Sequence, residues 1–266
     1  PNGGERLGGG SGTITWTSVG GVSGDLIDIA LITESPASSV EIAVNVPFDA
    51  SPFPWAALSG VADASNYKIR ILKAGSILVY DESNATFTVD NTTPTITSRV
   101  TLDTDGDGNV DQLDVIFSEP VRDSSFSAAR FTIDSQPGTS IVTGTADDNS
   151  FSVLFSGVIG TGEKSVTYTA GTGTDMATPG NLLATNTALA TDSALPVFLS
   201  ARTKTTTTIE ATFSEDLNGA TVTNADFVVT GFTLGAPDAF EIVPGVVRLT
   251  VTTPFETGDT PEVSYN

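Results

Sequence analysis

Leu113-Asp-Val-Ile-Phe-Ser-Glu-Pro120 and Ile209-Glu-Ala-Thr-Phe-Ser-Glu-Asp216 decide the fold of this chain of 266 residues. In both stretches apolar residues occupy alternate positions up to the Phe, which is the pattern of a strand with one buried face. The second stretch begins 96 residues after the first, and Tyr168 and Tyr265 repeat at an offset of 97. Self-similarity at a fixed spacing indicates two copies of one structural unit.

Alternating apolar residues also mark the rest of the chain, and no long stretch shows the periodicity of a helix. Gly, Pro, Asn and Asp separate the short runs, as expected between strands. The sequence therefore predicts an all-β protein made of tandem Ig-like antiparallel β-sandwiches. Asp90–Pro94 and Asp192–Pro196 resemble each other as linkers, which divides the chain into 1–92, 93–194 and 195–266. The runs that carry the pattern include Ile27/Ile29/Leu31, Val40/Ile42/Val44/Val46, Tyr67/Ile69/Ile71, Phe151/Val153/Phe155 and Val247/Leu249/Val251.

The third unit is shorter than the second at its C-terminal side. After Tyr168 the second unit continues through Asp175 and Asn181, whereas only Asn266 follows Tyr265. We expect the last sandwich to be completed from outside this segment. Either the polypeptide continues, or a neighbouring protomer donates a strand, for which Pro1–Gly12 is a weak candidate because Gly-rich sequence forms strands poorly.

An acidic loop, Asp103-Thr-Asp-Gly-Asp-Gly-Asn-Val-Asp-Gln-Leu-Asp114, is inserted in the first copy of the repeat only. The spacing of its oxygen-bearing side chains matches the arithmetic of a Ca²⁺ loop, and the glycines permit a tight wrap. We expect Ca²⁺ here, with Mg²⁺ a lesser possibility because the last Asp is shorter than the usual Glu. The loop follows the first linker, so we expect it to stiffen the first-to-second domain junction. The predicted ligands are Asp103, Asp105, Asp107, Asn109 through its carbonyl, Asp111 and Asp114.

Composition excludes several functional classes. The chain has 32 acidic and 11 basic residues, a net charge of −21, which disfavours nucleic acid and anionic membranes as partners. It has neither His nor Cys, so it lacks disulfides, His- or Cys-based nucleophile systems and the usual zinc ligands. No apolar run reaches the roughly 20 residues that span a bilayer. A first residue Pro1 without a visible signal peptide suggests a mature secreted protein or a trimmed form.

Two resemblances carry expectations about context. Residues 1–92 resemble the Ser/Thr-rich, glycosylphosphatidylinositol-anchored cell-wall protein domain through Pro1–Glu5, Thr13–Thr17, Ile27–Leu31, Asn66–Ile71 and Asp81–Asn84. That family implies an Ig-like sandwich on an extracellular surface and no catalytic residues. Residues 93–266 are similar to the Ig-like repeats of large bacterial surface, adhesin and S-layer proteins, through the acidic loop before Val-Ile-Phe-Ser-Glu-Pro and the Val-Thr-Tyr strand.

Aromatic and acidic residues outside the loop have structural and functional interpretations. Trp16 and Trp55 could stack on sugar rings, but the alternation of Trp16 with Ile14 favours the core, and Trp55 lies in an apolar turn. Asp81–Asn84 could hold a second cation, although a turn before the last strand of its domain explains it as well. Glu119 and Glu215 recur after Phe-Ser, which favours a structural role at a strand end over acid/base catalysis.

Asn84-Ala-Thr86 and Asn91-Thr-Thr93 match the N-glycosylation pattern, which arises often by chance in such sequences.

Three functions remain in competition. The first is a structural, calcium-stabilised cell-surface protein, such as an S-layer, surface filament or adhesin stalk, that associates with itself or with neighbouring surface proteins. The second is a carbohydrate- or cell-wall-glycan-binding accessory module of a larger secreted protein. The third is an enzyme that works with two carboxylates alone, as glycosidases can. Nothing in the sequence positions such a pair, so we expect no enzyme.

Overall fold

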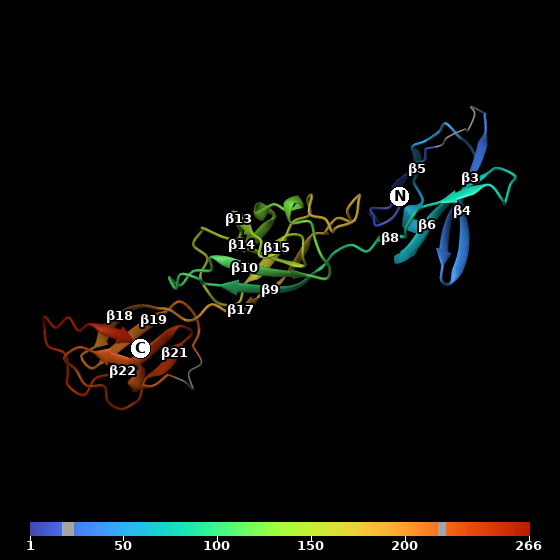
Figure 1. The fold of residues 1–266 in the computed structure, drawn as a ribbon. Coiled ribbons are helices and arrows are strands. Elements are labelled where there is room, and N and C mark those ends of the chain that lie inside the picture. The colour runs from blue at the N-terminus through green and yellow to red at the C-terminus, as the bar shows by residue number, and fades with distance from the viewer. Residues whose placement is uncertain (18–23, 218–221) are drawn as a thin grey trace.

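The computed structural model describes residues 1–17, 24–217 and 222–266, and they form three β-rich bodies that follow one another along an elongated chain (Figure 1). Each of the three predicted ranges contains its own cluster of buried apolar residues. We call these ranges domains 1, 2 and 3. Within the described residues the helical segments are four short 3-10 turns, and the rest of the regular structure is strand. The predicted all-β class with antiparallel sheets is confirmed.

Domain 1 is built on one large sheet with the order β1-β8-β6-β3-β4, where β7 also pairs with β6, and a small sheet of β2 and β5. Ile29 and Leu31 of β3 lie opposite Ile71 and Ile69 of β6, so the alternating residues of both strands share the core face. The elements are β1 (Arg6–Leu7), β2 (Gly12–Ile14), β3 (Leu26–Glu34), β4 (Ala37–Pro47), β5 (Phe53–Trp55), η1 (Leu58–Gly60), β6 (Ala64–Lys73), β7 (Tyr80–Glu82) and β8 (Phe87–Val89).

Strand β4 departs from the predicted core pattern. Val40 and Val44 are 60% and 48% exposed, whereas Val46 is buried. β4 is the edge of its sheet, and its register against β3 shifts twice between Ile27 and Ala30. Asn45 has φ 52, and its backbone N–H donates to Asp28. A bulge of this kind changes which residues face the core, so the period-2 pattern alone was wrong for this strand.

Domain 2 is a sandwich of a sheet ordered β13-β14-β10-β9-β17 and a sheet ordered β12-β11-β15-β16. Its core contains Phe117, Phe131, Phe151 and Tyr168, whose rings contact one another. The elements are β9 (Ile96–Leu102), β10 (Gln112–Phe117), η2 (Asp123–Ser125), η3 (Ala128–Arg130), β11 (Phe131–Ile133), β12 (Gln136–Pro137), β13 (Ser140–Val142), β14 (Ser150–Leu154), β15 (Ser165–Tyr168), β16 (Asn186–Leu189) and β17 (Thr191–Asp192).

Domain 3 repeats this plan with fewer strands among its described residues. One sheet has the order β18-β19-β22-β21, and β20 pairs with β23 in the other. Phe213 and Phe227 lie in its core, at the positions of Phe117 and Phe131 in domain 2. The elements are β18 (Phe198–Thr205), β19 (Thr208–Phe213), η4 (Asn224–Asp226), β20 (Phe227–Val229), β21 (Phe240–Val243), β22 (Val246–Thr250) and β23 (Val263–Tyr265).

The N-terminal segment is integrated into domain 1. β1 pairs in parallel with β8, and the Gly4 N–H donates to the Thr86 carbonyl over 2.8 Å. The Asn2 side chain accepts from the Asn84 N–H over 3.0 Å. Pro1–Gly12 is therefore occupied within its own domain, and the idea that it serves as a donor strand for domain 3 is wrong.

Candidate metal centre

The acidic loop connects β9 to β10 and turns back on itself at two glycines. Gly106 and Gly108 have φ of 76 and 87, the left-handed region that a residue without Cβ adopts freely. The carboxylate of Asp103 accepts the N–H groups of Gly106 and Gly108, each over 2.8 Å. This wrap brings carboxylate oxygens of Asp103, Asp105 and Asp107 within 4.8 Å of one another.

Of the other three predicted ligands, Asn109 stays beside this cluster, whereas Asp111 and Asp114 have hydrogen-bond partners elsewhere. Asp111 accepts from the Thr104 N–H and hydroxyl over 3.0 and 2.6 Å, so it closes the base of the loop. Asn109 donates its backbone N–H and its side-chain amide to the Asp107 carboxylate over 2.8 and 3.0 Å, and it forms an isolated β-bridge with Gly160. Asp114 lies on β10, where it accepts from the Ser152 hydroxyl over 2.6 Å and from Gln112 over 2.8 Å. The structure thus gathers the three carboxylates and keeps Asn109 beside them, whereas β10 begins at Gln112 and carries Asp114 away from the loop.

The electrostatics of the three gathered carboxylates favour a cation. No ion pair of the described residues involves Asp103, Asp105 or Asp107, and Asp105 and Asp107 are exposed. Hard divalent ions take carboxylate oxygens, backbone carbonyls and water as ligands. The three carboxylates are donors of the type that Ca²⁺ and other hard divalent ions take.

The loop faces domain 3 rather than domain 1. A Cβ on Gly108 would lie 3.1 Å from Leu199 Cδ2 and 3.1 Å from Ser214 Cβ, so the loop backbone closely approaches both residues of domain 3. The seven residues of β9 separate the loop from the first linker, about 23 Å at the rise of an extended strand. The expectation that this loop stiffens the first-to-second junction is wrong, because β9 carries it to the opposite end of domain 2.

Glu215 contributes a further carboxyl group at this second junction. Burial raises its pKa to about 7, and the neighbouring carboxyl groups of Asp192 and Asp103 add to the rise. Its Oε1 atom is buried with no hydrogen-bond partner among the described residues. The junction therefore concentrates negative charge from the acidic loop, the linker and domain 3.

A second carboxylate cluster lies at the first junction, and sequence reasoning did not find it. Oxygens of Asp90, Glu119 and Asp175 come within 4.8 Å of one another. Arg6 inserts between them: its Nε donates to Asp90 over 2.7 Å and its Nη2 to Glu119 over 2.8 Å. This cluster already holds a cation of its own, the guanidinium of domain 1.

The first junction is also closed by amide hydrogen bonds. The Asn181 side chain donates to the Asp90 carbonyl and to Asp175, each over 2.8 Å, and accepts from the Gly9 N–H over 2.8 Å. Burial raises the pKa of Glu119 to about 6, with help from Asp90 and Asp175 and against the effect of Arg6. The one sequence feature that pointed to this cluster was the Glu that follows Phe-Ser in both copies, Glu119 and Glu215. In both copies this Glu lies beside the Asp of the preceding linker, a structural position as expected.

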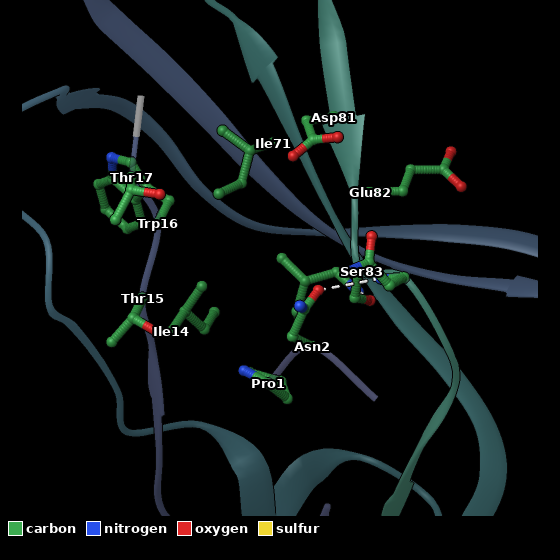
Figure 2. Close-up of a pocket in the computed structure, with 12 residues that line it drawn as sticks. Pro1, Asn2, Ile14, Thr15, Trp16, Thr17, Ile71, Asp81, Glu82 and Ser83 are labelled. Atoms are coloured by element: carbon green, nitrogen blue, oxygen red, sulfur yellow. Dashed lines mark hydrogen bonds between the residues drawn. The ribbon is translucent and has the colours of Figure 1, made fainter. Parts of the chain in front are cut away.

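Domain 1 has a pocket of about 320 Å³ that bears on the carbohydrate alternative (Figure 2). Trp16, Ile71, Asp81 and Asn2 line it. Trp16 is half-buried: strand β2 ends at Ile14, and the Trp16 indole N–H donates to the Phe48 carbonyl over 2.9 Å. Trp16 packs against the domain 1 core, as its alternation with Ile14 predicted, but it is only partly buried.

The remaining sequence candidates have structural roles. Trp55 is 3% exposed and packs edge-to-face against Phe87, as expected of a core residue. In Asp81–Asn84, Glu82 pairs with Arg70 over 2.7 Å, and Ser83 accepts from the Ile69 N–H. Asn84 is exposed, whereas the Asn91 side chain donates to the Leu58 and Val61 carbonyls, which holds it away from glycosylation.

Comparisons with known proteins add little beyond fold class. No protein-family model and no curated protein matches the chain. Among solved structures, a three-Ig titin fragment is 10% identical with a TM-score of 0.29, covering 97% of this chain and 88% of its own. A marsupial T cell receptor is 10% identical with a TM-score of 0.28, and the match covers 99% of this chain and 98% of the receptor chain. A Bacteroides ovatus glucan-utilization protein, SGBP-B, solved with a mixed-linkage heptasaccharide, is 9% identical with a TM-score of 0.21. The match covers 98% of this chain and 59% of SGBP-B. Similarity at this level places the chain in no family.

No helix of the described residues has the length and apolar composition needed to cross a membrane.

Proposed function

We propose that this chain is a structural segment of a cell-surface protein, in which Ca²⁺ at the acidic loop stiffens the junction between domains 2 and 3. The observation that carries the proposal is the convergence of Asp103, Asp105 and Asp107 at a loop whose Gly108 leaves no room for a Cβ beside Leu199 and Ser214 of domain 3. An ion bound there neutralises repulsion at the junction and ties the loop down against its neighbour.

The wider context of the proposal is an extracellular array, such as an S-layer, surface filament or adhesin stalk. Its support is the tandem order of the sandwiches, the net charge of −21 and the absence of His and Cys. Extended arrays gain from joints that resist bending, and the two junctions differ in how they achieve this. At the first junction the guanidinium of Arg6 pairs with the carboxylates. At the second junction, no ion pair of the described residues involves Asp103, Asp105 or Asp107.

Calcium titration of the full chain tests the ion itself. We expect saturable Ca²⁺ binding by calorimetry, which Asp107→Ala abolishes while strand content by circular dichroism is retained. Asp49→Ala, which removes an exposed carboxylate of domain 1, is the matched control and is expected to leave binding unchanged. An ion that binds only the folded state at 100 times its Kd raises stability by about 2.7 kcal/mol. Absence of binding, or equal loss in both variants, contradicts the assignment.

Spin-label distances test the junction. Because the chain has no Cys, engineered pairs label cleanly. We expect Ca²⁺ to narrow the distance distribution between Thr143→Cys and Thr253→Cys, which span domains 2 and 3. The pair Ser39→Cys and Thr143→Cys spans domains 1 and 2 and is expected to stay unchanged. All three positions are exposed. If Ca²⁺ narrows the distance distributions of both pairs equally, or of neither pair, the proposed stiffening of the junction between domains 2 and 3 is refuted.

The carbohydrate alternative rests on one observation, the half-buried Trp16 beside Asp81 and Asn2 in a pocket of about 320 Å³ (Figure 2). An indole that lines a pocket together with polar side chains can stack its ring face on a sugar. Since Trp55 is buried, quenching by soluble cell-wall oligosaccharides would report Trp16. Saturable quenching that disappears in Trp16→Phe favours the alternative, and an unchanged spectrum removes it.

A further inference from the structure

The outer face of the four-stranded sheet in domain 3 gathers basic residues in a chain whose net charge is −21. Arg202 of β18 and Arg248 of β22 lie opposite Glu210 of β19 on its two sides, so the three side chains share one face. Lys204 also reaches Glu210. Arg202, Lys204 and Arg248 are all the basic residues of domain 3. We call them, together with Glu210, the basic face.

One carboxylate serves three cations on the basic face. Glu210 Oε2 lies 2.8 Å from Arg202 Nη2 and 3.4 Å from Lys204 Nζ, and Glu210 Oε1 lies 3.5 Å from Arg248 Nη2. The Glu210 side chain is 5% exposed, whereas those of Arg202 and Lys204 are 71% and 50% exposed. The other ion pairs of the described residues supply at least one carboxylate for each cation. The basic face therefore carries two positive charges in excess of its one carboxylate.

The corresponding face of domain 2 shows that the sandwich does not require these cations. At the same offset of 96 residues, Asp114 of β10 takes the place of the buried carboxylate, and it lies opposite Val100 of β9 and Ser152 of β14. It accepts from the uncharged Ser152 hydroxyl over 2.6 Å. Ile116 on the same face is 43% exposed, so this face is open in domain 2 as well. The three cations of domain 3 thus exceed what this position in the fold needs.

The hairpin loop between β13 and β14 of domain 2 carries the opposite charge. Asp147 and Asp148 are adjacent in it, and Asp123 of η2 lies beside them. The Asp123 N–H donates to the Asp147 carboxylate, and the Asp147 N–H donates to that of Asp123, each over 3.1 Å, so the two segments hold each other in place. Among the described residues, none of the three takes part in an ion pair. We call Asp123, Asp147 and Asp148 the acidic hairpin.

The acidic hairpin is separate from the two carboxylate clusters at the junctions, which are engaged within their own chain. The cluster at the first junction holds Arg6, and the acidic loop lies at the second junction, where Gly108 approaches domain 3. The hairpin lies at the first-junction end of domain 2, because the Val121 N–H donates to the Asp148 carbonyl and Val121 also forms a bridge with Asp175. Domain 3 follows at the opposite end of domain 2 (Figure 1). The basic face and the acidic hairpin of one copy therefore lie apart, and a second copy is needed to bring them together.

We propose that the basic face of one copy binds the acidic hairpin of a second copy, so that domain 3 of one chain lies alongside domain 2 of the next. Charge complementarity selects this occupant, because the hairpin brings carboxylates without cations to a face with cations in excess. The remaining surface, in a chain of net charge −21, repels other alignments of two copies. Since the two surfaces are different patches of one chain, the contact is heterologous and repeats from copy to copy. The proposal goes beyond the calcium joint and does not depend on it.

The test follows self-association of the full chain in chelator by sedimentation velocity. We expect assemblies that grow with protein concentration and shrink with added salt, because salt screens exposed charges. The face variant, Arg202→Gln with Lys204→Gln, is expected to raise the dissociation constant at least tenfold. Lys73→Gln with Arg130→Gln removes two exposed cations of domains 1 and 2, and this control is expected to associate like the wild type.

The hairpin variant, Asp147→Asn with Asp148→Asn, probes the other side of the contact. It removes two charges and keeps side-chain oxygens that accept the same hydrogen bonds, and Asn tolerates the left-handed φ of 57 at position 147. We expect the same loss of at least tenfold, with a melting curve that shows a folded chain. Asp49→Asn with Glu163→Gln removes two exposed carboxylates elsewhere and is expected to leave association unchanged.

A mixture of the two variants decides whether these two surfaces meet each other. The face variant keeps its acidic hairpin and the hairpin variant keeps its basic face, so one intact contact forms between them and no further copy adds to it. We expect heterodimers, and nothing larger, at concentrations where each variant alone is monomeric. A contact between two identical surfaces would not be restored by mixing.

Each other outcome overturns the proposal. A wild-type chain that stays monomeric at low salt, equal losses in a variant and its control, or a mixture without heterodimers would each exclude this contact. Association that is lost in only one of the two variants would place the partner of that surface elsewhere. Dextran sulfate is the probe for a different occupant: if it binds a monomeric wild-type chain and not the face variant, the basic face takes an anionic polymer instead of a second copy.

Discussion

Replacing Glu119 by Gln is expected to stabilise domain 2 at neutral pH, although it removes one of the two carboxylates that pair with Arg6. Glu119 is only 14% exposed, faces Asp90 and Asp175, and has one oxygen without a partner among the described residues. Its pKa of about 6 lies above the ordinary value of 4.5, even with Arg6 beside it. Burial and like charges therefore cost the ionised form more than Arg6 returns.

The size and the pH dependence of the effect follow from that shift. A pKa raised from 4.5 to about 6 lowers the free energy of unfolding by roughly 2 kcal/mol above pH 7, where Glu119 is ionised. Because the folded pKa is raised, Glu119 costs nothing below about pH 4.5, and stability is lost as pH rises through about 6. Gln keeps an oxygen that can accept from Arg6, and its amide can donate to the adjacent carboxylates. We expect a gain of about 2 kcal/mol at pH 7.5 and almost none at pH 4.5.

Scanning calorimetry across pH 4.5 to 7.5 measures this on the domain 2 transition. For a domain of about 100 residues, 2 kcal/mol corresponds to a Tm shift of roughly 10 °C. Glu163→Gln removes the same charge at an exposed position of the same domain and is expected to change Tm little. A Glu119→Gln chain with unchanged or lower Tm at pH 7.5 would show that the ion pair with Arg6 outweighs burial.

Three further substitutions probe the junctions and domain 1. Arg6→Met leaves Asp90 and Glu119 without their cation and is expected to cost about 2–3 kcal/mol in calorimetry, below the roughly 3–5 kcal/mol of fully buried pairs. Gly106→Ala and Gly108→Ala both place a Cβ on a left-handed residue, which is expected to cost roughly 1–2 kcal/mol of stability in each variant. Gly108→Ala is expected to cost more, because only its Cβ would lie 3.1 Å from atoms of domain 3. Equal losses of Tm in the two variants would refute this close approach. Trp16→Ala is expected to lower the free energy of unfolding by about 2 kcal/mol in urea denaturation, less than the roughly 3–5 kcal/mol of a fully buried Trp, because Trp16 is only partly buried; a loss within the higher range would contradict this reasoning.

The fold was predictable because its signals are local. Alternation around Phe117 and Phe213 predicts strands because side-chain period is a property of adjacent residues, and the offset of 96 residues between the copies, which comparing the sequence with itself reveals, predicts tandem sandwiches. The exception was β4, where the bulge at Asn45 reverses the alternation, and nothing in the apolar pattern marks a bulge.

The candidate site was predictable only in part, because its geometry depends on where strands end. The convergence of Asp103, Asp105 and Asp107 follows from the glycines between them. The position of Asp114 depends on β10 beginning at Gln112, and the position of the loop depends on the direction of β9. The meeting of Arg6 with Glu119 joins residues 113 positions apart, a contact that a single sequence does not encode locally.

The parallel pairing of first and last strands has a mechanical consequence. In domain 1, β1 enters beside the departing β8, and three successive backbone bonds, Gly4 to Thr86, Thr88 to Glu5 and Asp90 to Leu7, join them. Tension along the chain pulls two parallel strands in opposite directions, so these bonds are loaded together in shear rather than opened one after another. β9 and β17 give domain 2 the same clamp, whereas β18 of domain 3 has no such partner among the described residues. Under force, domains 1 and 2 are therefore expected to resist until the bonds of each clamp break together.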